Sequence, residues 1–201
     1  MGHDFEDGVC IRCGESEEAG ECYFDDFSDC VAPWYHEAVD FTVANGLMNG
    51  MGDGLFGPNT ALSRAMVVTV LYREAGSPAV SAPSTFTDVP EGIWYSDAIA
   101  WAQDNGIVNG VTTTEFAPDQ NVTREQIATI LWRYAGSPLA EADLSVFGDA
   151  ASISPYAANA IHWAVSNGIM NGDGENLNPL NSATRAEFAC MIMRYLGGSY
   201  D

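Results

Sequence analysis

The stretch Thr123-Arg124-Glu125-Gln126, followed by residues 127–134 (IATILWRY), decides the fold of this chain. The hydroxyl of Thr123 can accept a hydrogen bond from the backbone N–H of Gln126. The Gln126 side chain can reach back to the N–H of Thr123, and this reciprocal cap is typical of a helix start. Apolar side chains then recur at the spacing of one helix face: Ile127, Ile130, Leu131 and Tyr134. The stretch therefore predicts an amphipathic helix that follows Thr123.

The same unit occurs three times in the chain. Ser63-Arg64 and Thr184-Arg185 precede equivalent apolar stripes, and the three arginines are 60 and 61 residues apart. A period of this length indicates a structural repeat, in which each unit needs its neighbours to bury its apolar face.

The charge of the chain is distributed in the same way. With 28 acidic and 7 basic residues the net charge is −21, which argues against a nucleic acid or an anionic lipid surface as partner. There is no lysine, and six of the seven arginines form three pairs with a spacing of nine residues. These are Arg64 with Arg73, Arg124 with Arg133, and Arg185 with Arg194. Almost every fixed positive charge is therefore at a repeated position.

The two arginines of each pair have different expected roles. The second lies in the last turn of its helix, where a cation interacts favourably with the helix dipole. The first lies in the first turn, where the dipole opposes it, so contact with an anionic or polar ligand competes with a structural pairing to nearby acids. Nine residues are about two and a half helical turns, so the two arginines of one helix point to opposite sides.

The chain contains no run of apolar residues long enough for a transmembrane helix, and we expect no membrane insertion. Residues 1–7 lack the charged and apolar regions of a secretion signal. The segment is therefore expected to be either intracellular or a piece of a longer exported protein.

Residues 1–24 are expected to form an acidic, cysteine-containing N-terminal arm. Cys10 and Cys13 form a CxxC motif, with Cys22 and Cys30 following and His3 preceding it. Three alternatives remain open: zinc held by cysteines of this set with His3, two disulfides, or free thiols. Cys190 lies within a predicted helix and is interpreted as a core residue.

Three repeats follow the arm, at residues 25–78, 79–138 and 139–201. Each opens with an aromatic-x-Asp motif, continues with a helix that begins near an aromatic residue and ends at Asn-Gly, and then passes through a glycine-rich loop to the Ser/Thr-Arg helix. The fold class is thus mainly α, with three helix-loop-helix repeats. Packing of the three second helices would bury their apolar stripes in a pseudo-threefold unit.

These motifs resemble the S-layer homology domain. In the second repeat they are Phe86-Thr87-Asp88, Trp94, Asn105-Gly106, Phe116-Ala117-Pro118 and Thr123-Arg124. The resemblance extends over three tandem copies, and it implies a trefoil around a central three-helix bundle. It also implies a non-catalytic module at the bacterial cell surface or cell wall. Such modules bind secondary cell-wall polysaccharide, often carrying acidic ketal-pyruvate, in grooves between copies.

Carried over residue by residue, the resemblance implies three kinds of ligand contact. The arginines would contact carboxylates or hydroxyls of the ligand, the aspartates would accept from sugar hydroxyls, and the aromatic rings would stack on sugar faces. The candidate ligand-binding residues are Arg64, Arg124, Arg185, Asp29, Asp88, Asp149, Trp34, Trp94 and Tyr156. The second copy, with Arg124, Trp94 and Asp88, has the best-formed set.

Structural roles compete with these assignments. The tryptophans could be core aromatics, and the aspartates could be turn or cap residues. The histidines His3, His36 and His162 occupy unrelated repeat positions without a nucleophile motif, so we expect no enzyme and no catalytic residue. A protein-binding or adhesion module with degenerate glycan grooves is the alternative function.

Overall fold

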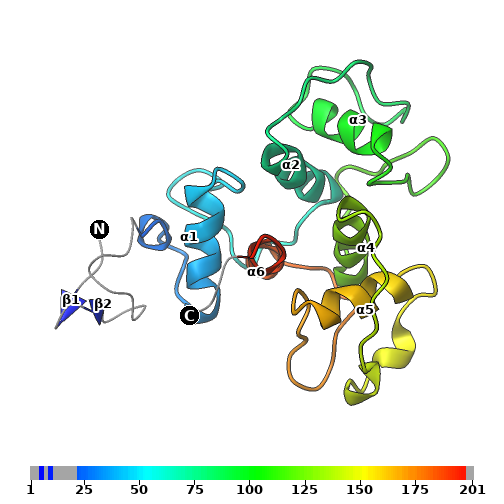
Figure 1. Ribbon diagram of the computed structural model, residues 1–201. Coiled ribbons are helices and arrows are strands. Elements are labelled where there is room, and N and C mark those ends of the chain that lie inside the picture. Colours follow the sequence, from blue (N-terminus) through cyan, green and yellow to red (C-terminus); the bar gives the residue numbers. More distant parts are fainter. Residues whose placement is uncertain (1–4, 7–8, 11–21, 198–201) are drawn as a thin grey trace. The chain divides into compact units, whose positions relative to one another are not determined.

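The chain is mainly α-helical. The computed structural model describes residues 5–6, 9–10 and 22–197, with side chains from residue 22 onward (Figure 1). The helices are α1 (His36–Ala44), α2 (Arg64–Glu74), α3 (Ser96–Asp104), α4 (Arg124–Tyr134), α5 (Ala158–Ser166) and α6 (Arg185–Tyr195). They form three successive pairs along the chain, as the three helix-loop-helix repeats predict.

Shorter elements lie outside these six helices. Strands β1 (Phe5–Glu6) and β2 (Val9–Cys10) pair antiparallel, with Phe5 opposite Cys10. Single 3₁₀ turns occur before the first helices of the first and third repeats, at Phe24–Asp26, Pro33–Tyr35, Leu144–Val146 and Ala150–Ser152.

The second helix of each repeat begins where its cap predicts. Thr123 accepts from the N–H of Gln126 at 3.4 Å and its own N–H donates to Gln126 Oε1 at 3.1 Å, so the capping box is formed. Thr184 and Glu187 form the same pair of bonds. In the first repeat Ser63 accepts from the N–H of Met66, but methionine has no oxygen to return the bond. The first repeat therefore keeps only half of the cap.

The chain divides into two compact units. One comprises residues 1–60 and 184–201, and the other comprises residues 61–183. In the first unit α1 packs against α6, and in the second α2 packs against α3 and α4 against α5. Each of these pairs joins the second helix of one repeat to the first helix of another, so the packing partners are out of phase with the sequence repeat. The repeat boundaries given above remain predictions.

The helix pairs are held by apolar side chains that are fully buried. Phe56 and Phe188 have no exposed surface in the first unit, and Phe116, Ile99 and Leu131 have none in the second. Burying a phenylalanine or leucine side chain contributes about 1.5–3 kcal/mol, so these buried helix and loop side chains are the main source of stability. Phe56 and Phe116 precede the Pro-containing loops that meet the repeated arginines.

Candidate functional site

The three aspartates of the aromatic-x-Asp motifs share one structural role. Each carboxylate accepts from two successive backbone N–H groups of the loop in its own repeat. Asp88 accepts from Phe116 and Ala117 at 2.8 and 2.7 Å, and the corresponding bonds of Asp29 and Asp149 are all 2.8 Å. The aspartates therefore fix the loop of their repeat, while their contact with a ligand remains a prediction.

The loop that Asp88 fixes contains an unfavourable backbone conformation. Ala117 has φ of 59°, in the left-handed region that costs a residue with a Cβ about 1–2 kcal/mol. Asn178 has the same conformation in the third repeat, and the first repeat has Gly57 there. The two charge-assisted hydrogen bonds to the aspartate offset this cost and hold the loop in one conformation.

The first-turn arginines are largely buried, and each binds the loop of another repeat. Arg64 donates from Nε to the carbonyl of Phe116 at 2.9 Å and from Nη2 to that of Asn109 at 3.0 Å. Its guanidinium carbon lies 4.5 Å from the centroid of the Phe116 ring. Arg185 makes the same contacts to the first repeat's loop, with Nε 2.7 Å from the carbonyl of Phe56. These bonds explain why a cation is retained where the helix dipole opposes it.

The backbone N–H groups at the start of the second helix also bind the loop of the next repeat. The N–H groups of Arg64 and Ala65 donate to the carbonyls of Gln120 and Pro118, both at 3.0 Å. Equivalent bonds join the start of α4 to the loop of the third repeat, where Arg124 Nε also donates to the carbonyl of Leu177 at 2.9 Å. These carbonyls satisfy N–H groups that a helix N-terminus leaves without intrahelical partners. The second helix of one repeat therefore docks on the loop of the next.

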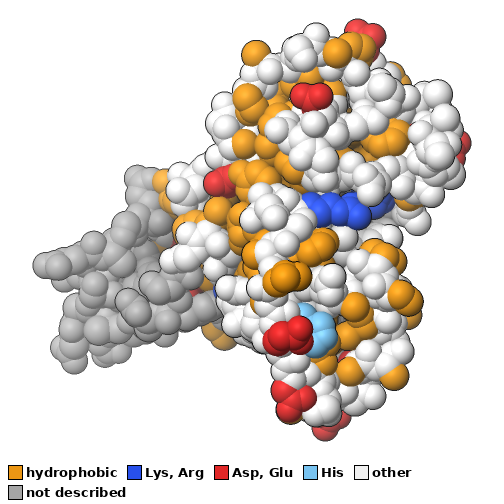
Figure 2. Space-filling model, turned by 45° about the vertical axis from the view of Figure 1, so that its right-hand side comes forward, with side chains coloured by type: hydrophobic (Ala, Val, Ile, Leu, Met, Phe, Trp, Pro, Cys, Tyr) orange, Lys and Arg blue, Asp and Glu red, His pale blue; other side chains and the backbone are white. Residues whose placement is uncertain are grey.

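A pocket of about 270 Å³ lies beside Arg64 in the unit formed by residues 61–183. All three repeats contribute to it: Arg64 comes from the first, the loop of residues 108–111 and helix α4 from the second, and Tyr156 from the third. The side of α4 that lines the pocket presents Gln126, Thr129, Ile130 and Arg133. Figure 2 shows arginine side chains in a furrow of the molecular surface. We call this cavity the Arg64 pocket.

The Arg64 pocket concentrates positive charge in a strongly acidic chain. Burial lowers the pKa of Arg64, and the neighbouring Arg133 lowers it further, whereas Tyr156 and Asp88 act in the opposite direction. Among residues 22–197, no carboxylate lies within ion-pair distance of either arginine. Since the described residues offer these two guanidinium groups no ionic partner, they are suited to binding an anion in the neighbouring cavity.

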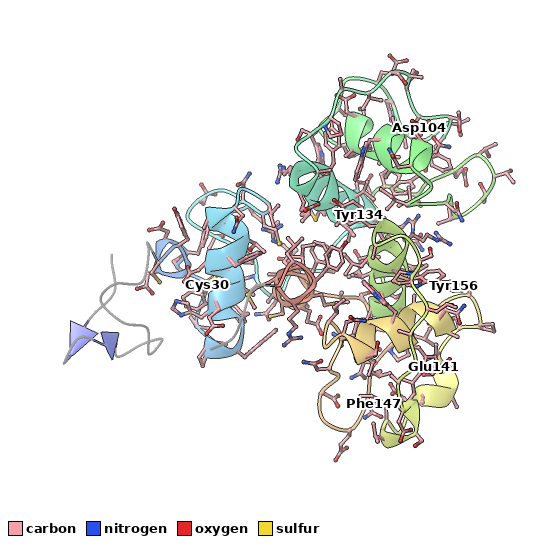
Figure 3. All side chains as sticks on the ribbon, viewed as in Figure 1. Cys30, Asp104, Tyr134, Glu141, Phe147 and Tyr156 are labelled. Carbon is pink, nitrogen blue, oxygen red and sulfur yellow. The ribbon has the colours of Figure 1, made fainter. Side chains whose placement is uncertain are left out.

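Tyr156 is held at the edge of the pocket by a buried carboxylate. Its hydroxyl donates to Glu125 Oε1 at 2.8 Å, while Glu125 Oε2 accepts from the N–H of Ser154 at 3.0 Å. Glu125 is only 2% exposed, but 54% of Tyr156 is accessible, and Figure 3 labels this residue near the start of α5. Burial and the bond to Glu125 raise the pKa of Tyr156. The hydroxyl is thus fixed while part of the ring remains available to a ligand.

The tryptophans at the equivalent position are also exposed. Trp34 is 52% and Trp94 60% accessible, and each ring meets the following tyrosine edge to face, with centroids 4.9 and 5.0 Å apart. Both rings therefore lie at the surface rather than in the core. Stacking on a sugar remains a prediction for them.

The structure groups the candidate residues differently from their order in the sequence. Asp88 fixes the loop that binds Arg64, whereas Arg124 binds the loop fixed by Asp149. The sequence interpretation also missed Arg133 and Glu125. Two features of the sequence could have pointed to them. The paired arginines of one helix face opposite sides, which makes Arg133 available to another site, and Glu125 stands where the other copies have alanine.

Most of the predicted zinc ligands lie outside the described part of the molecule. His3 and Cys13 are not among the described residues, and Cys10 is described only by its backbone in β2. Cys22 and Cys30 are buried. Burial, followed by the charges of Asp29 and Asp40, raises the pKa of the Cys30 thiol to about 12.

Within residues 22–197, none of the helices has the length and apolarity to span a membrane.

Comparison with known proteins identifies the repeat. The family model of the S-layer homology domain matches the chain three times, at residues 23–65, 85–128 and 146–189. The chain is 36% identical over 180 residues to the Surface-layer 125 kDa protein of Lysinibacillus sphaericus, covering 88% of this chain and 15% of that protein. It is 30% identical over 183 residues to an amylopullulanase of Thermoanaerobacterium thermosulfurigenes, covering 88% and 10%.

A third relative is Cell surface glycoprotein 1 of Acetivibrio thermocellus. It is 29% identical over 164 residues, which cover 74% of this chain and 7% of the glycoprotein. The chain thus spans only a small part of each of these relatives. The match to the enzyme covers the S-layer homology repeats of this chain and a tenth of the enzyme's length.

Proposed function

Because the chain belongs to the S-layer homology domain family, we propose that it is a non-catalytic module that anchors a longer protein to the bacterial cell wall. Family membership, together with the surface-layer and cell-surface relatives, supports localisation to the cell surface or cell wall. The ligand that we propose is secondary cell-wall polysaccharide, with acidic substituents such as ketal-pyruvate recognised by arginine.

The observation that carries the proposal is the Arg64 pocket. Arg64 and Arg133 offer guanidinium N–H groups that match a sugar carboxylate, and Tyr156 offers an accessible ring beside them. Asp88, whose charge acts on Arg64, and Glu125 are occupied by hydrogen bonds to the loop and to Tyr156. The pocket thus combines positive charge with an aromatic surface, as an acidic glycan requires.

The negative charge of the whole chain does not prevent this binding. Repulsion between exposed charges is screened beyond about 8–10 Å at physiological salt, whereas hydrogen bonds in a partly buried pocket act at contact distance. A short-range contact from two arginines can therefore exceed the long-range repulsion between an acidic protein and an acidic polymer.

We also propose that the three copies close into a trefoil around a central three-helix bundle. The cyclic order of the contacts supports this arrangement, because the first repeat's arginine binds the second loop, the second binds the third, and the third binds the first. In such an arrangement each arginine would border a groove between copies. The nine proposed ligand contacts then follow from the repeat, with the Arg64 pocket as the one best supported.

The experiment is co-sedimentation with purified cell-wall sacculi. Arg133→Gln removes one guanidinium from the pocket without breaking a hydrogen bond within residues 22–197. A charge-assisted hydrogen bond contributes about 1.5–3 kcal/mol, so we expect affinity to fall roughly 10- to 100-fold. Leu139→Glu, at a 90% exposed position outside the pocket, changes the net charge by the same amount and is expected to bind like wild type.

Two further preparations identify the ligand. Sacculi from which pyruvate has been removed are expected to bind the wild-type chain more weakly, and sacculi stripped of secondary polysaccharide are expected not to bind it. Equal sedimentation of Arg133→Gln and wild type would refute the role of the pocket. Undiminished binding to stripped sacculi would refute polysaccharide as the ligand and favour a protein partner.

A further inference from the structure

A second cluster of reactive side chains lies in the first unit, among residues that the glycan proposal does not use. Cys22 precedes the 3₁₀ turn at Phe24–Asp26, His36 is the first residue of α1, and Asp40 lies one helical turn later. The ligating atoms of the three side chains all lie within 4.8 Å of one another. Cys22 and His36 are buried, and Asp40 is partly exposed.

The geometry of the cluster distinguishes a metal site from a catalytic relay. Cys22 Sγ lies 3.2 Å from Nε2 of His36, and Asp40 Oδ2 lies 3.1 Å from the same nitrogen. In a nucleophile–histidine–carboxylate triad the two partners bind opposite ring nitrogens, so that a proton can pass through the imidazole. In the cluster, Nε2 of His36 faces both Cys22 and Asp40. A proton therefore cannot pass through the imidazole from one partner to the other. Three possible ligand atoms within 4.8 Å of one another are instead placed as coordination of one metal ion requires.

The distances fit a tetrahedral zinc ion. Zinc binds thiolate sulfur at about 2.3 Å and imidazole nitrogen or carboxylate oxygen at about 2.0–2.2 Å, which places neighbouring ligand atoms roughly 3.3–3.6 Å apart. The two distances of the cluster are close to this range. A thiolate and a carboxylate within 4.8 Å of each other would also repel, and a divalent cation would neutralise both.

The groups around the cluster orient its ligands. The N–H of Phe24 donates to Oδ1 of Asp40 at 2.7 Å, which leaves Oδ2 directed toward His36. The Phe24 ring stacks on the imidazole, with centroids 4.1 Å apart and planes inclined by 7°. Hydrogen bonding of a ligating carboxylate and fixation of a ligating ring are typical outer-shell features of metal sites.

We propose that Cys22, His36 and Asp40 bind a single Zn²⁺ ion. Mixed sulfur, nitrogen and oxygen donors favour zinc over calcium or magnesium, which prefer oxygen alone. The ion ties the segment that precedes the first repeat to the start of α1. Of the zinc ligands predicted from sequence, this site shares Cys22, and it adds two residues that the sequence interpretation left without a role in metal binding. It is independent of the glycan function.

The test measures zinc in the whole chain. Metal is removed with a chelator, zinc is added back in competition with a chromophoric chelator, and bound zinc is counted by elemental analysis. The chain used for this measurement carries Cys10→Ser and Cys13→Ser, so that the CxxC motif does not contribute. We expect this background chain to bind one equivalent of zinc. A background chain that binds no zinc, in a fold that circular dichroism shows to be intact, would overturn the proposal.

Substitutions then assign the ligands. Asp40→Asn keeps an oxygen for the Phe24 N–H but replaces Oδ2 by an amide, so it should fold and bind zinc at least tenfold more weakly. Cobalt substitution should give a thiolate-to-metal charge-transfer band that Cys22→Ser removes and Cys30→Ser retains. Zinc affinity unchanged by Asp40→Asn, or a cobalt band lost equally in Cys30→Ser, would refute the assignment.

Discussion

Replacement of Asp88 by asparagine tests the structural role of the repeated aspartates. In the wild type, Asp88 Oδ1 and Oδ2 accept from the N–H groups of Phe116 and Ala117. Asparagine retains one acceptor and directs an NH₂ group at the other N–H, so one charge-assisted bond is replaced by two opposed donors. A bond to a charged group contributes about 1.5–3 kcal/mol, and an unsatisfied donor costs about 1–3 kcal/mol. We expect Asp88→Asn to lower the free energy of unfolding by roughly 2–4 kcal/mol.

Thermal unfolding and hydrogen exchange measure this loss at two levels. For a chain of this size, each kcal/mol corresponds to about 2–4 °C in Tm, so the expected decrease is roughly 5–15 °C. The amides of Phe116 and Ala117 should also exchange faster, because their acceptor is impaired. Asp119→Asn is the matched control, since Asp119 is exposed in the same loop and should change stability by less than about 0.5 kcal/mol. Equal Tm values for Asp88→Asn and Asp119→Asn, with unchanged exchange at both amides, would refute the reasoning.

Two further predictions concern the loop and the pocket. Ala117→Gly should raise the free energy of unfolding, measured by urea denaturation, by roughly 0.5–1 kcal/mol. Glycine relieves the positive φ, and this gain exceeds the free-energy cost of a more flexible unfolded chain. A lower urea midpoint for Ala117→Gly would contradict this prediction. Tyr156 should titrate above the ordinary tyrosine range in an alkaline absorbance titration compared with Tyr156→Phe. Since the folded pKa of Tyr156 is raised, the stabilisation that Tyr156 contributes is complete below about pH 10 and is lost as the pH rises further. Ionisation of Tyr156 at the ordinary tyrosine pKa would disprove the bond to Glu125.

Several features of the fold could be predicted because they depend on neighbours in the sequence. The capping boxes at Thr123 and Thr184 and the missing return bond at Met66 involve residues three positions apart. Hydrogen bonds at this spacing and apolar stripes along one helix are specified by local geometry, which the sequence states directly. The repeat and the family follow from the recurrence of these local motifs.

The assembly of the site could not be read in the same way. The spacing of Arg64 and Arg73 predicts that they lie on opposite sides of α2, but it does not say which loop either side meets. Arg64 reaches Asn109 and Phe116, which are 45 and 52 residues away. The sequence therefore supplied Arg64 and Tyr156 as candidates, while Arg133 joined them only through packing of helices from different repeats.

The sequence by itself determined six helices, three matching arginines and the family to which the chain belongs. The tertiary structure alone decided that the aspartates hold loops, that Glu125 fixes Tyr156, and that Cys22 meets His36 and Asp40. The physical reason is that helix periodicity fixes the face on which a side chain lies, whereas its partner depends on how loops of many residues close. Buried hydrogen bonds and apolar contacts between distant segments select that closure, and they exist only in the folded chain.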